Sequence, residues 1–105
     1  MKSKGNKMEK MTRCPTHPGL VFKTTVLDEN NITVSKAAEA LGLSRTTMSR
    51  FCNGRTPCTP EIAQRIAFSI DSNVAVWINL QASYDAWFAE NNKKPHVQKL
   101  LNVAA

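Results

Sequence analysis

The chain has 105 residues, a mass of 11.7 kDa and a formal net charge of +6. This length allows one domain with a modest hydrophobic core, so a dimer interface would add stability. The excess of lysine and arginine favours a polyanionic partner. The longest apolar run, residues 74–78, is too short to span a membrane, and no apolar segment follows the N-terminal lysines to form a secretory signal. We therefore expect a cytoplasmic protein without a membrane partner.

The positive charge is concentrated in two segments. Residues 1–13 hold five basic residues and one acidic residue, and residues 34–55 hold four basic residues and one acidic residue. The first segment lacks apolar periodicity, so we expect a disordered basic arm that either follows DNA or only aids solubility. We divide the chain into this arm (1–13), a helical domain (14–91) whose motifs predict DNA binding and dimerisation, and a tail or short helix (92–105).

The first helix of this domain begins at Pro18, because proline is favoured in the first turn of a helix. We expect this first helix to reach about Leu27, followed by a turn at Asn30 and Asn31. Its candidate inner residues are Leu20, Val21 and Leu27.

Residues 33–53 predict a helix-turn-helix. Ala37, Ala38 and Leu41 recur at helical spacing and are followed by Gly42, a residue that suits the tight exit from a helix. The small Ala38 would allow a second helix to cross closely. Ser44 can accept a backbone N–H of that second helix, which begins at Arg45.

The second helix of this unit has an apolar face and a slim polar face. Its inner residues are Met48, Phe51 and Cys52, and its outer residues are Arg45, Thr46, Ser49, Arg50 and Asn53. A polar, basic outer face favours insertion into the DNA major groove, with the preceding helix crossing the backbone. The alternative is an ordinary helical hairpin within a small bundle.

Two more helices and a tail complete the domain. Thr59, Pro60 and Glu61 form a strong start signal for a fourth helix, with Ile62, Ile66 and Ile70 pointing inward. A fifth helix follows Asn73 and carries Trp77, Leu80, Tyr84 and Trp87 at intervals of three and four. We expect Trp77 to pack in the core. The candidate dimer interface is Tyr84, Trp87 and Phe88.

The tail has apolar residues at helical spacing after Pro95. They are Val97, Leu100, Leu101 and Ala104. This pattern leaves open a sixth short helix that docks on a partner subunit or on another protein.

Metal binding and catalysis have little support. Cys14 and His17 have the spacing of a zinc half-site that Cys52 and Cys58 could complete, but Cys52 falls on an inner helical face and suits packing better. Three cysteines are too few for a disulfide framework. Neither His17 nor His96 belongs to a recognisable nucleophile arrangement. We therefore predict neither a metal nor a cofactor, and no catalytic residue.

Over most of residues 13–90 the sequence resembles the HigA (VapI-like) antitoxins of the Xre-type helix-turn-helix regulators. The resemblance includes motifs outside the DNA-reading unit. The matching groups are His17-Pro18-Gly19, Gly42-Leu43-Ser44-Arg45, Ser49-Arg50, Asn53-Gly54, Thr59-Pro60-Glu61, Trp77, Leu80-Gln81 and Tyr84-Asp85.

This resemblance implies an all-α, five-helix lambda-repressor-like fold and a homodimer that binds double-stranded DNA at a palindromic operator in its own promoter. It also implies a HigB-type mRNA-cleaving toxin as second partner. Two departures matter: Val34 stands where the family often has glutamine, and Leu20 where it has glutamate. A stand-alone, phage-like Xre repressor remains the alternative, and an interaction module without DNA binding is a weaker one.

The resemblance also assigns roles along the second helix. Arginine can donate two hydrogen bonds to a guanine, which makes Arg45 the first candidate for base recognition. The candidate base-reading residues are Arg45, Thr46, Ser49 and Arg50. The candidate DNA-backbone residues are Ser44, Thr47, Asn53, Lys36 and Arg55.

Overall fold

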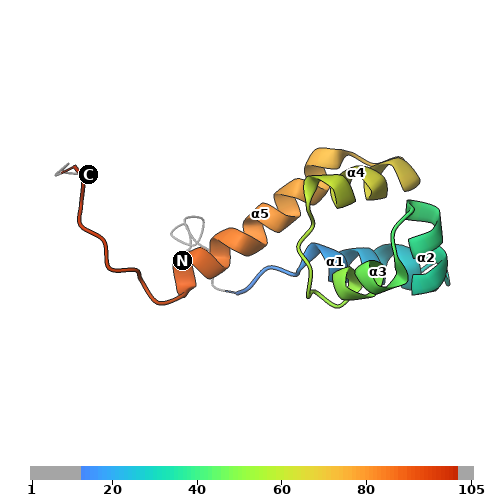
Figure 1. Cartoon of the computed structure of the whole chain (residues 1–105), viewed down its shortest axis with the longest axis horizontal. Helices are drawn as coiled ribbons and strands as arrows, with labels where there is room; N and C mark the ends of the chain where they lie inside the picture. The colour runs from blue at the N-terminus through green and yellow to red at the C-terminus, as the bar shows by residue number, and fades with distance from the viewer. Residues whose placement is uncertain (1–12, 102–105) are drawn as a thin grey trace, which may run out of the picture.

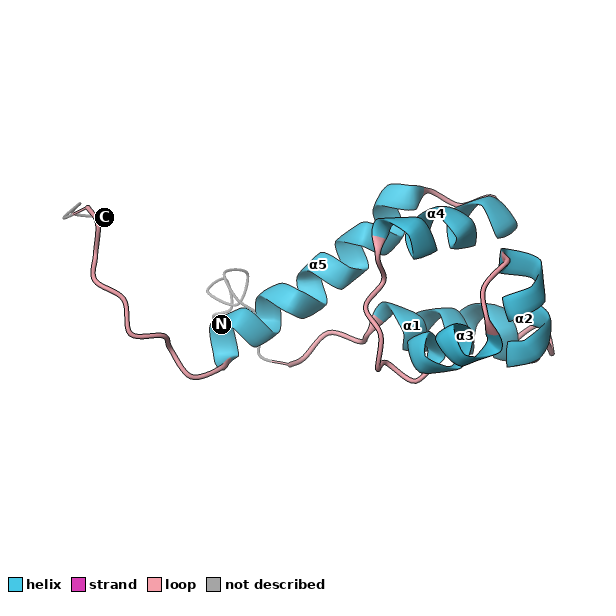
Figure 2. Ribbon diagram, in the orientation of Figure 1, coloured by secondary structure: helices cyan, strands magenta, loops and turns pink. Residues whose placement is uncertain are grey.

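A computed structural model describes residues 13–101 of the chain. In this part of the chain all regular structure is helical, and Figure 2 shows helices joined by short loops. The segments are α1 (Pro18–Phe22), the π-helical segment η2 (Lys23–Asp28), α2 (Val34–Leu41), α3 (Arg45–Cys52), α4 (Pro60–Ser69) and α5 (Val74–Asn91). Figure 1 shows a body of α1 to α4 from which the distal half of α5 projects. The prediction of an all-α, five-helix domain is confirmed.

The predicted starts of α2, α3 and α4 are correct, and a side chain caps each one: Ser44 and Thr59 were expected to do so, and Thr33 was not. Thr33, Ser44 and Thr59 each accept a backbone N–H three residues further on, at 3.1, 3.0 and 3.2 Å. Each side-chain oxygen satisfies one of the amides that a helix leaves without a partner in its first turn. These caps set the first residues of α2, α3 and α4.

The predicted first helix is present, but its second half widens into a π-helical turn. Thr24 and Thr25 donate their hydroxyls to main-chain carbonyls three and four residues earlier, which competes with regular α-helical bonding. Phe22 and Leu27 are both buried at a spacing of five, the span of an i to i+5 hydrogen bond in a π turn. The prediction that Leu20 points inward was wrong: its side chain is 41% exposed.

The core forms around α3. Met48, Phe51 and Cys52 are buried there, as the pattern predicted. The ring of Phe22 lies 6.1 Å from that of Phe51 and 6.0 Å from that of Trp77, so aromatic contacts join α1, α3 and α5. The predicted burial of Trp77 is confirmed.

Gly19 permits a close approach between α1 and the end of α3. A Cβ atom at this position would lie 1.6 Å from the main-chain oxygen of Phe51. No side chain fits there, because the obstructing atom belongs to the backbone. The first helix can therefore rest directly on the end of α3.

The tail forms no helix between residues 92 and 101. The optional sixth helix is therefore absent from this described part of the tail, and Ala104 lies outside the described residues. Val97, Leu100 and Leu101 are exposed instead of packed, because the tail extends away from the body in Figure 1 and finds no apolar surface. Among the helices within residues 13–101, none is long and apolar enough to cross a membrane.

Candidate nucleic-acid interface

The turn between α2 and α3 is held in one conformation. Gly42 ends α2 with a φ of 73°, a left-handed value that glycine adopts without steric cost. The N–H of Leu43 donates to the carbonyl of Ala38 at 2.9 Å. Arg65 of α4 adds a bond from Nη1 to the carbonyl of Leu41 at 2.8 Å. The angle between the two helices is thus fixed by α4 as well as by the turn.

The outer face of α3 carries the predicted base-reading residues. Arg45, Thr46 and Arg50 are exposed, and Ser49 is half-buried. Thr46 and Arg50 lie opposite the buried Met48 and Phe51 on this helix of eight residues, Ser49 lies between the two sides, and Arg45 is exposed as the first residue of the helix. The face is therefore short, polar and basic, as major-groove recognition requires.

Arg45 is held by a residue that the sequence analysis did not single out. Its Nε donates to the Oγ of Ser35 at 2.7 Å, across the turn from the first turn of α2. Within residues 13–101 this is the only hydrogen bond of the Arg45 guanidinium, so both terminal nitrogens remain available to an external acceptor. A short hydroxyl residue ten positions before the first residue of α3 is the sequence signal that could have identified this contact.

The predicted backbone residues at the start of α3 form a small hydroxyl relay. Ser44 accepts the N–H of Thr47 at its Oγ and donates its own hydroxyl to Thr47 Oγ1 at 2.9 Å. Ser44 is thereby committed to capping the helix, whereas the hydroxyl hydrogen of Thr47 can still be donated outward. Of these two residues, Thr47 is the better placed to reach a phosphate.

The remaining backbone candidates flank α3 on both sides. Asn53 ends the helix, and its Nδ2 donates to the carbonyl of Ser49 at 2.9 Å. Arg55 follows in the next loop and Lys36 lies in the first turn of α2, and both are exposed. Asn53 and Arg55 thus follow the outer face of α3 directly, whereas Lys36 belongs to α2 and also lines a groove beside η2 and α4. This arrangement suits a polyanion.

His17 contacts both α1 and α5 and so helps to hold this unit in place. Its Nδ1 accepts the N–H of Gly19 at 2.8 Å and so caps α1, while its ring packs at 4.9 Å from that of Tyr84. Burial lowers the pKa of His17 below its ordinary value, although the Thr56 backbone and the charge of Asp85 oppose the shift. The ring is therefore suited to a neutral, structural role and not to catalysis.

Comparisons with known proteins place the chain in a family. A helix-turn-helix domain model matches residues 28–67. The HTH-type transcriptional regulator YbaQ of Escherichia coli K12, itself uncharacterised, is 36% identical over 87 residues, or 83% of this chain and 77% of that protein. Antitoxin HigA-1 of Vibrio cholerae is 32% identical over 84 residues, or 80% of this chain and 79% of that protein. The chain belongs to the HigA (VapI-like) family of Xre-type helix-turn-helix regulators.

A solved structure of this family supports the same assignment. Pseudomonas aeruginosa antitoxin HigA, determined with the higBA promoter, has a TM-score of 0.68 and 28% identity over 73% of this chain and 86% of that chain. HigA-type proteins of this family are DNA-binding regulators and antitoxins, not enzymes. Family membership thus agrees with the basic face built around α3.

The candidate dimer residues lie at the distal end of α5. Tyr84 and Trp87 are half-buried, and Phe88 is 36% exposed with its ring 4.9 Å from Tyr84 and 5.1 Å from Trp87. The indole N–H of Trp87 is buried and has no hydrogen-bond partner among the described residues. Tyr84 therefore packs against the body of this HigA-type chain through its contact with His17. Trp87 and Phe88 lie further along α5, beyond this contact.

The three cysteines are free thiols and form no disulfide. Cys14 is exposed, whereas Cys52 and Cys58 are buried in the core. Burial raises the pKa of the Cys58 thiol to about 11 and also raises that of Cys52. Between residues 13 and 101 no three potential metal ligands gather. The backbone N–H of Cys58 donates to Gln81 Oε1 at 2.6 Å, which ties the loop before α4 to α5.

Proposed function

We propose that this chain is a homodimeric repressor that binds a palindromic operator in its own promoter and neutralises a HigB-type toxin encoded beside it. The proposal has two halves, DNA binding and toxin neutralisation. DNA binding is supported by the position of Arg45, which is exposed at the first position of α3 and oriented by Ser35. Operator binding by related HigA proteins supports the same half. The antitoxin half rests on the relative named antitoxin HigA-1.

In this proposal α3 enters the major groove. The two terminal nitrogens of Arg45 donate hydrogen bonds to guanine O6 and N7. Thr46, Ser49 and Arg50 reach neighbouring base edges. Phosphate contacts fix the register without reading sequence. Their candidates are Thr47, Asn53, Lys36 and Arg55, with Ser44 acting through Thr47.

The dimer provides the second half of the operator contact. One short basic face touches too few phosphates for tight binding at cellular salt, so two copies are needed. Tyr84, Trp87 and Phe88 are the proposed interface, since they belong to the C-terminal half of α5 and form one group of aromatic rings there. Figure 1 shows that this half of α5 projects from the body. A twofold dimer would place its two α3 helices about one helical turn of DNA apart, roughly 34 Å.

The DNA-binding half is tested by a gel-shift titration on the DNA upstream of the chain's own gene, with a scrambled duplex as reference. Arg45→Ala should cost about 1 to 3 kcal/mol on the operator, roughly 5- to 150-fold, and relax base preference. Arg55→Ala removes the same charge but should weaken operator and scrambled DNA alike. Equal losses on both duplexes for Arg45→Ala would remove the base-reading role of this residue.

The antitoxin half is tested by co-expressing the chain with the protein encoded next to it. Co-purification and relief of growth arrest support an antitoxin. The Arg45→Ala variant should still relieve the arrest, because its defect lies on the DNA face. If the wild-type chain neither co-purifies nor rescues growth but still binds its operator, it is a stand-alone repressor, the role indicated by relatives known only as transcriptional regulators.

A further inference from the structure

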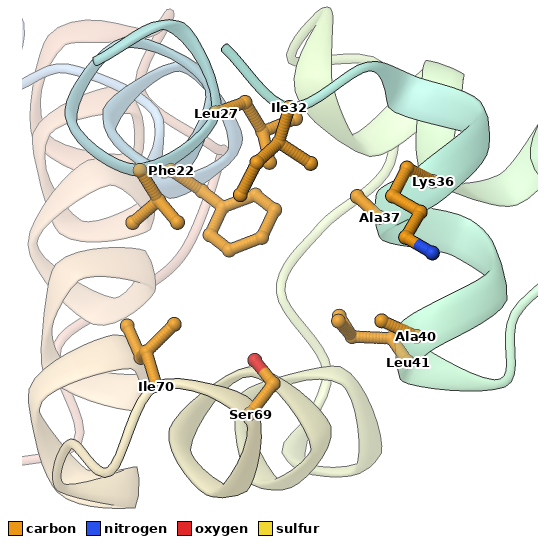
Figure 3. Close-up of a pocket in the computed structure, with 10 residues that line it drawn as sticks. Phe22, Leu27, Ile32, Lys36, Ala37, Ala40, Leu41, Ser69 and Ile70 are labelled. Carbon is orange, nitrogen blue, oxygen red and sulfur yellow. The ribbon is translucent and has the colours of Figure 1, made fainter. Parts of the chain in front are cut away.

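An apolar groove with a volume of about 220 Å³ lies between η2, α2 and α4. Figure 3 shows Phe22 and Ile32 on one side, Ile70 on another, and Ala40 and Leu41 on the α2 wall. The polar side chains that line it are those of Lys36 and Ser69.

The size of the groove limits its occupant. Pockets for drug-sized ligands span about 300 to 1,000 Å³. A cavity of about 150 Å³ holds a benzene molecule. A groove of about 220 Å³ therefore suits one or two aliphatic side chains, such as those of a short peptide segment.

Four acidic residues are next in sequence to residues that line this groove. Asp28 and Glu29 follow its lining residue Leu27, Glu39 precedes Ala40, and Asp71 follows Ile70. These are four of the eight acidic residues in the chain. Against them stand Lys36 in the groove wall and Lys23, which pairs with Asp28 at 2.9 Å. The chain segments that form the groove therefore carry more acidic than basic residues at these positions, although the protein as a whole is basic.

The tail has the complementary character. Val97, Leu100 and Leu101 are 76%, 94% and 71% exposed, three large apolar side chains within five residues. Residues 92–101 also contain Lys93, Lys94 and Lys99 and no acidic residue. An extended basic segment with clustered aliphatic side chains matches, in both properties, an apolar groove whose lining residues have acidic neighbours in sequence.

The geometry points to a second copy of the chain as the source of this segment: we propose that the groove of one subunit receives residues 97–101 of another. Figure 1 shows the tail leaving the end of α5 that is remote from α2. The 18 residues of α5 measure about 27 Å, and residues 92–100 span at most about 30 Å when fully extended. To reach the groove of its own chain, the tail would have to be almost fully extended back along α5. The tail of a second copy is not subject to this limit. This inference does not depend on operator binding.

Disulfide trapping between two differently tagged copies tests the proposal. One copy carries Gln98→Cys, which keeps all three aliphatic side chains, and the other carries Ala40→Cys in the groove wall; both carry Cys14→Ser. Ala82→Cys, an equally exposed alanine on α5, replaces Ala40→Cys as the control. We expect the mixed-tag disulfide to form at least about tenfold faster at position 40 than at position 82, since a buried leucine is worth at least that much in occupancy.

A second pair of variants tests whether the aliphatic side chains carry the contact. Leu100→Asp with Leu101→Asp on the Gln98→Cys copy should reduce trapping to the control rate. Asn92→Asp with His96→Asp adds the same charge to polar positions of the tail and should retain most of it. Equal losses in the two pairs would overturn the apolar docking.

Two further outcomes would also overturn the proposal. The first is equal trapping at positions 40 and 82. The second is a disulfide within one chain that carries both Ala40→Cys and Gln98→Cys in dilute solution, because the tail would then occupy its own groove. Circular dichroism on every variant establishes that helical content is retained.

Discussion

At the residue scale, the contact between Arg45 and Ser35 would determine how α3 meets a base pair in the proposed complex with DNA. A flexible arginine loses side-chain entropy when it is ordered on binding. The bond from Nε to Ser35 Oγ orders the guanidinium before DNA arrives and uses its inner donor. Only the two terminal nitrogens then remain for guanine, so recognition should occur end-on.

Ser35→Ala should therefore reduce operator affinity by about 0.5 to 1.5 kcal/mol, the worth of one hydrogen bond, while binding to scrambled DNA changes little. Ser35→Thr keeps the hydroxyl and should restore the preference. Ser83→Ala, at an exposed serine of α5, is the matched control. Gel-shift titrations on both duplexes measure the ratio, and an unchanged ratio for Ser35→Ala would show that Arg45 is not positioned by this contact.

His17 makes the stability of the fold depend on pH. Its Nδ1 must stay unprotonated to accept the Gly19 N–H, and a positive charge there would also oppose the N-terminal dipole of the helix. Burial lowers its folded-state pKa below the ordinary 6.5. The unfolded chain therefore binds the proton more readily, so stability from neutral His17 is complete above about pH 6.5 and is lost as pH falls through the folded-state pKa.

We expect the free energy of unfolding to fall between about pH 7 and pH 5 in the wild-type chain. His17→Asn, which offers a cap oxygen that does not titrate in this range, should lose much of that dependence. His96→Asn changes the other histidine, which is exposed, and should keep it. Urea denaturation at several pH values provides the measurement. Parallel profiles for all three proteins would contradict this role of His17.

At the element scale, contact between α1 and α3 depends on the absence of a side chain at Gly19. Gly19→Ala would place a Cβ 1.6 Å from the Phe51 oxygen, and neither backbone can move without separating two elements of the core. We expect destabilisation of at least about 3 kcal/mol, at the upper end for overpacking. Thermal unfolding of Gly19→Ala measures this. A melting temperature close to that of the wild type would mean that α1 is free to shift.

Sequence patterns predicted most of these elements because the determinants are local. Thr33, Ser44 and Thr59 cap their helices within three residues, and the apolar face of α3 follows the α-helical period. Phe22 was missed because a π turn changes the period from which inward positions are inferred. The contact of Ser35 with Arg45 was not predicted because the two residues lie on different helices, and such contacts depend on tertiary geometry.

The tail shows the opposite limit of pattern-based prediction. Residues after Pro95 have helical spacing, yet residues 92–101 form no helix. Isolated short helices are only marginally stable in water and need an apolar surface to pack against. Helical spacing therefore reports which residues could share a face, and the neighbouring surface decides whether the helix forms.

At the scale of the whole molecule, the DNA face and the proposed dimer face lie on different parts of the body. The candidate contacts gather around α2 and α3, whereas Trp87 and Phe88 lie on the projecting half of α5 (Figure 1). A substitution on α5 should therefore disrupt the proposed dimer without altering the proposed DNA contacts of α3. This separation allows the contribution of the dimer to DNA binding to be measured directly.

The salt dependence of operator binding should reveal that contribution. If Lys36 and Arg55 each neutralise one phosphate, a dimer makes four such contacts, and the slope of log K against log salt should be about −3.6. Phe88→Asp, which buries a charge if the dimer forms, should leave a monomer with a slope of about −1.8. Any lysines of residues 1–13 that touch DNA steepen both slopes in proportion, so the twofold ratio holds.

Ala82→Asp, which introduces the same charge at an exposed alanine of α5, is the control and should keep the steeper slope. Equal slopes for the two variants, with both proteins retaining their helical content, would place the dimer interface elsewhere.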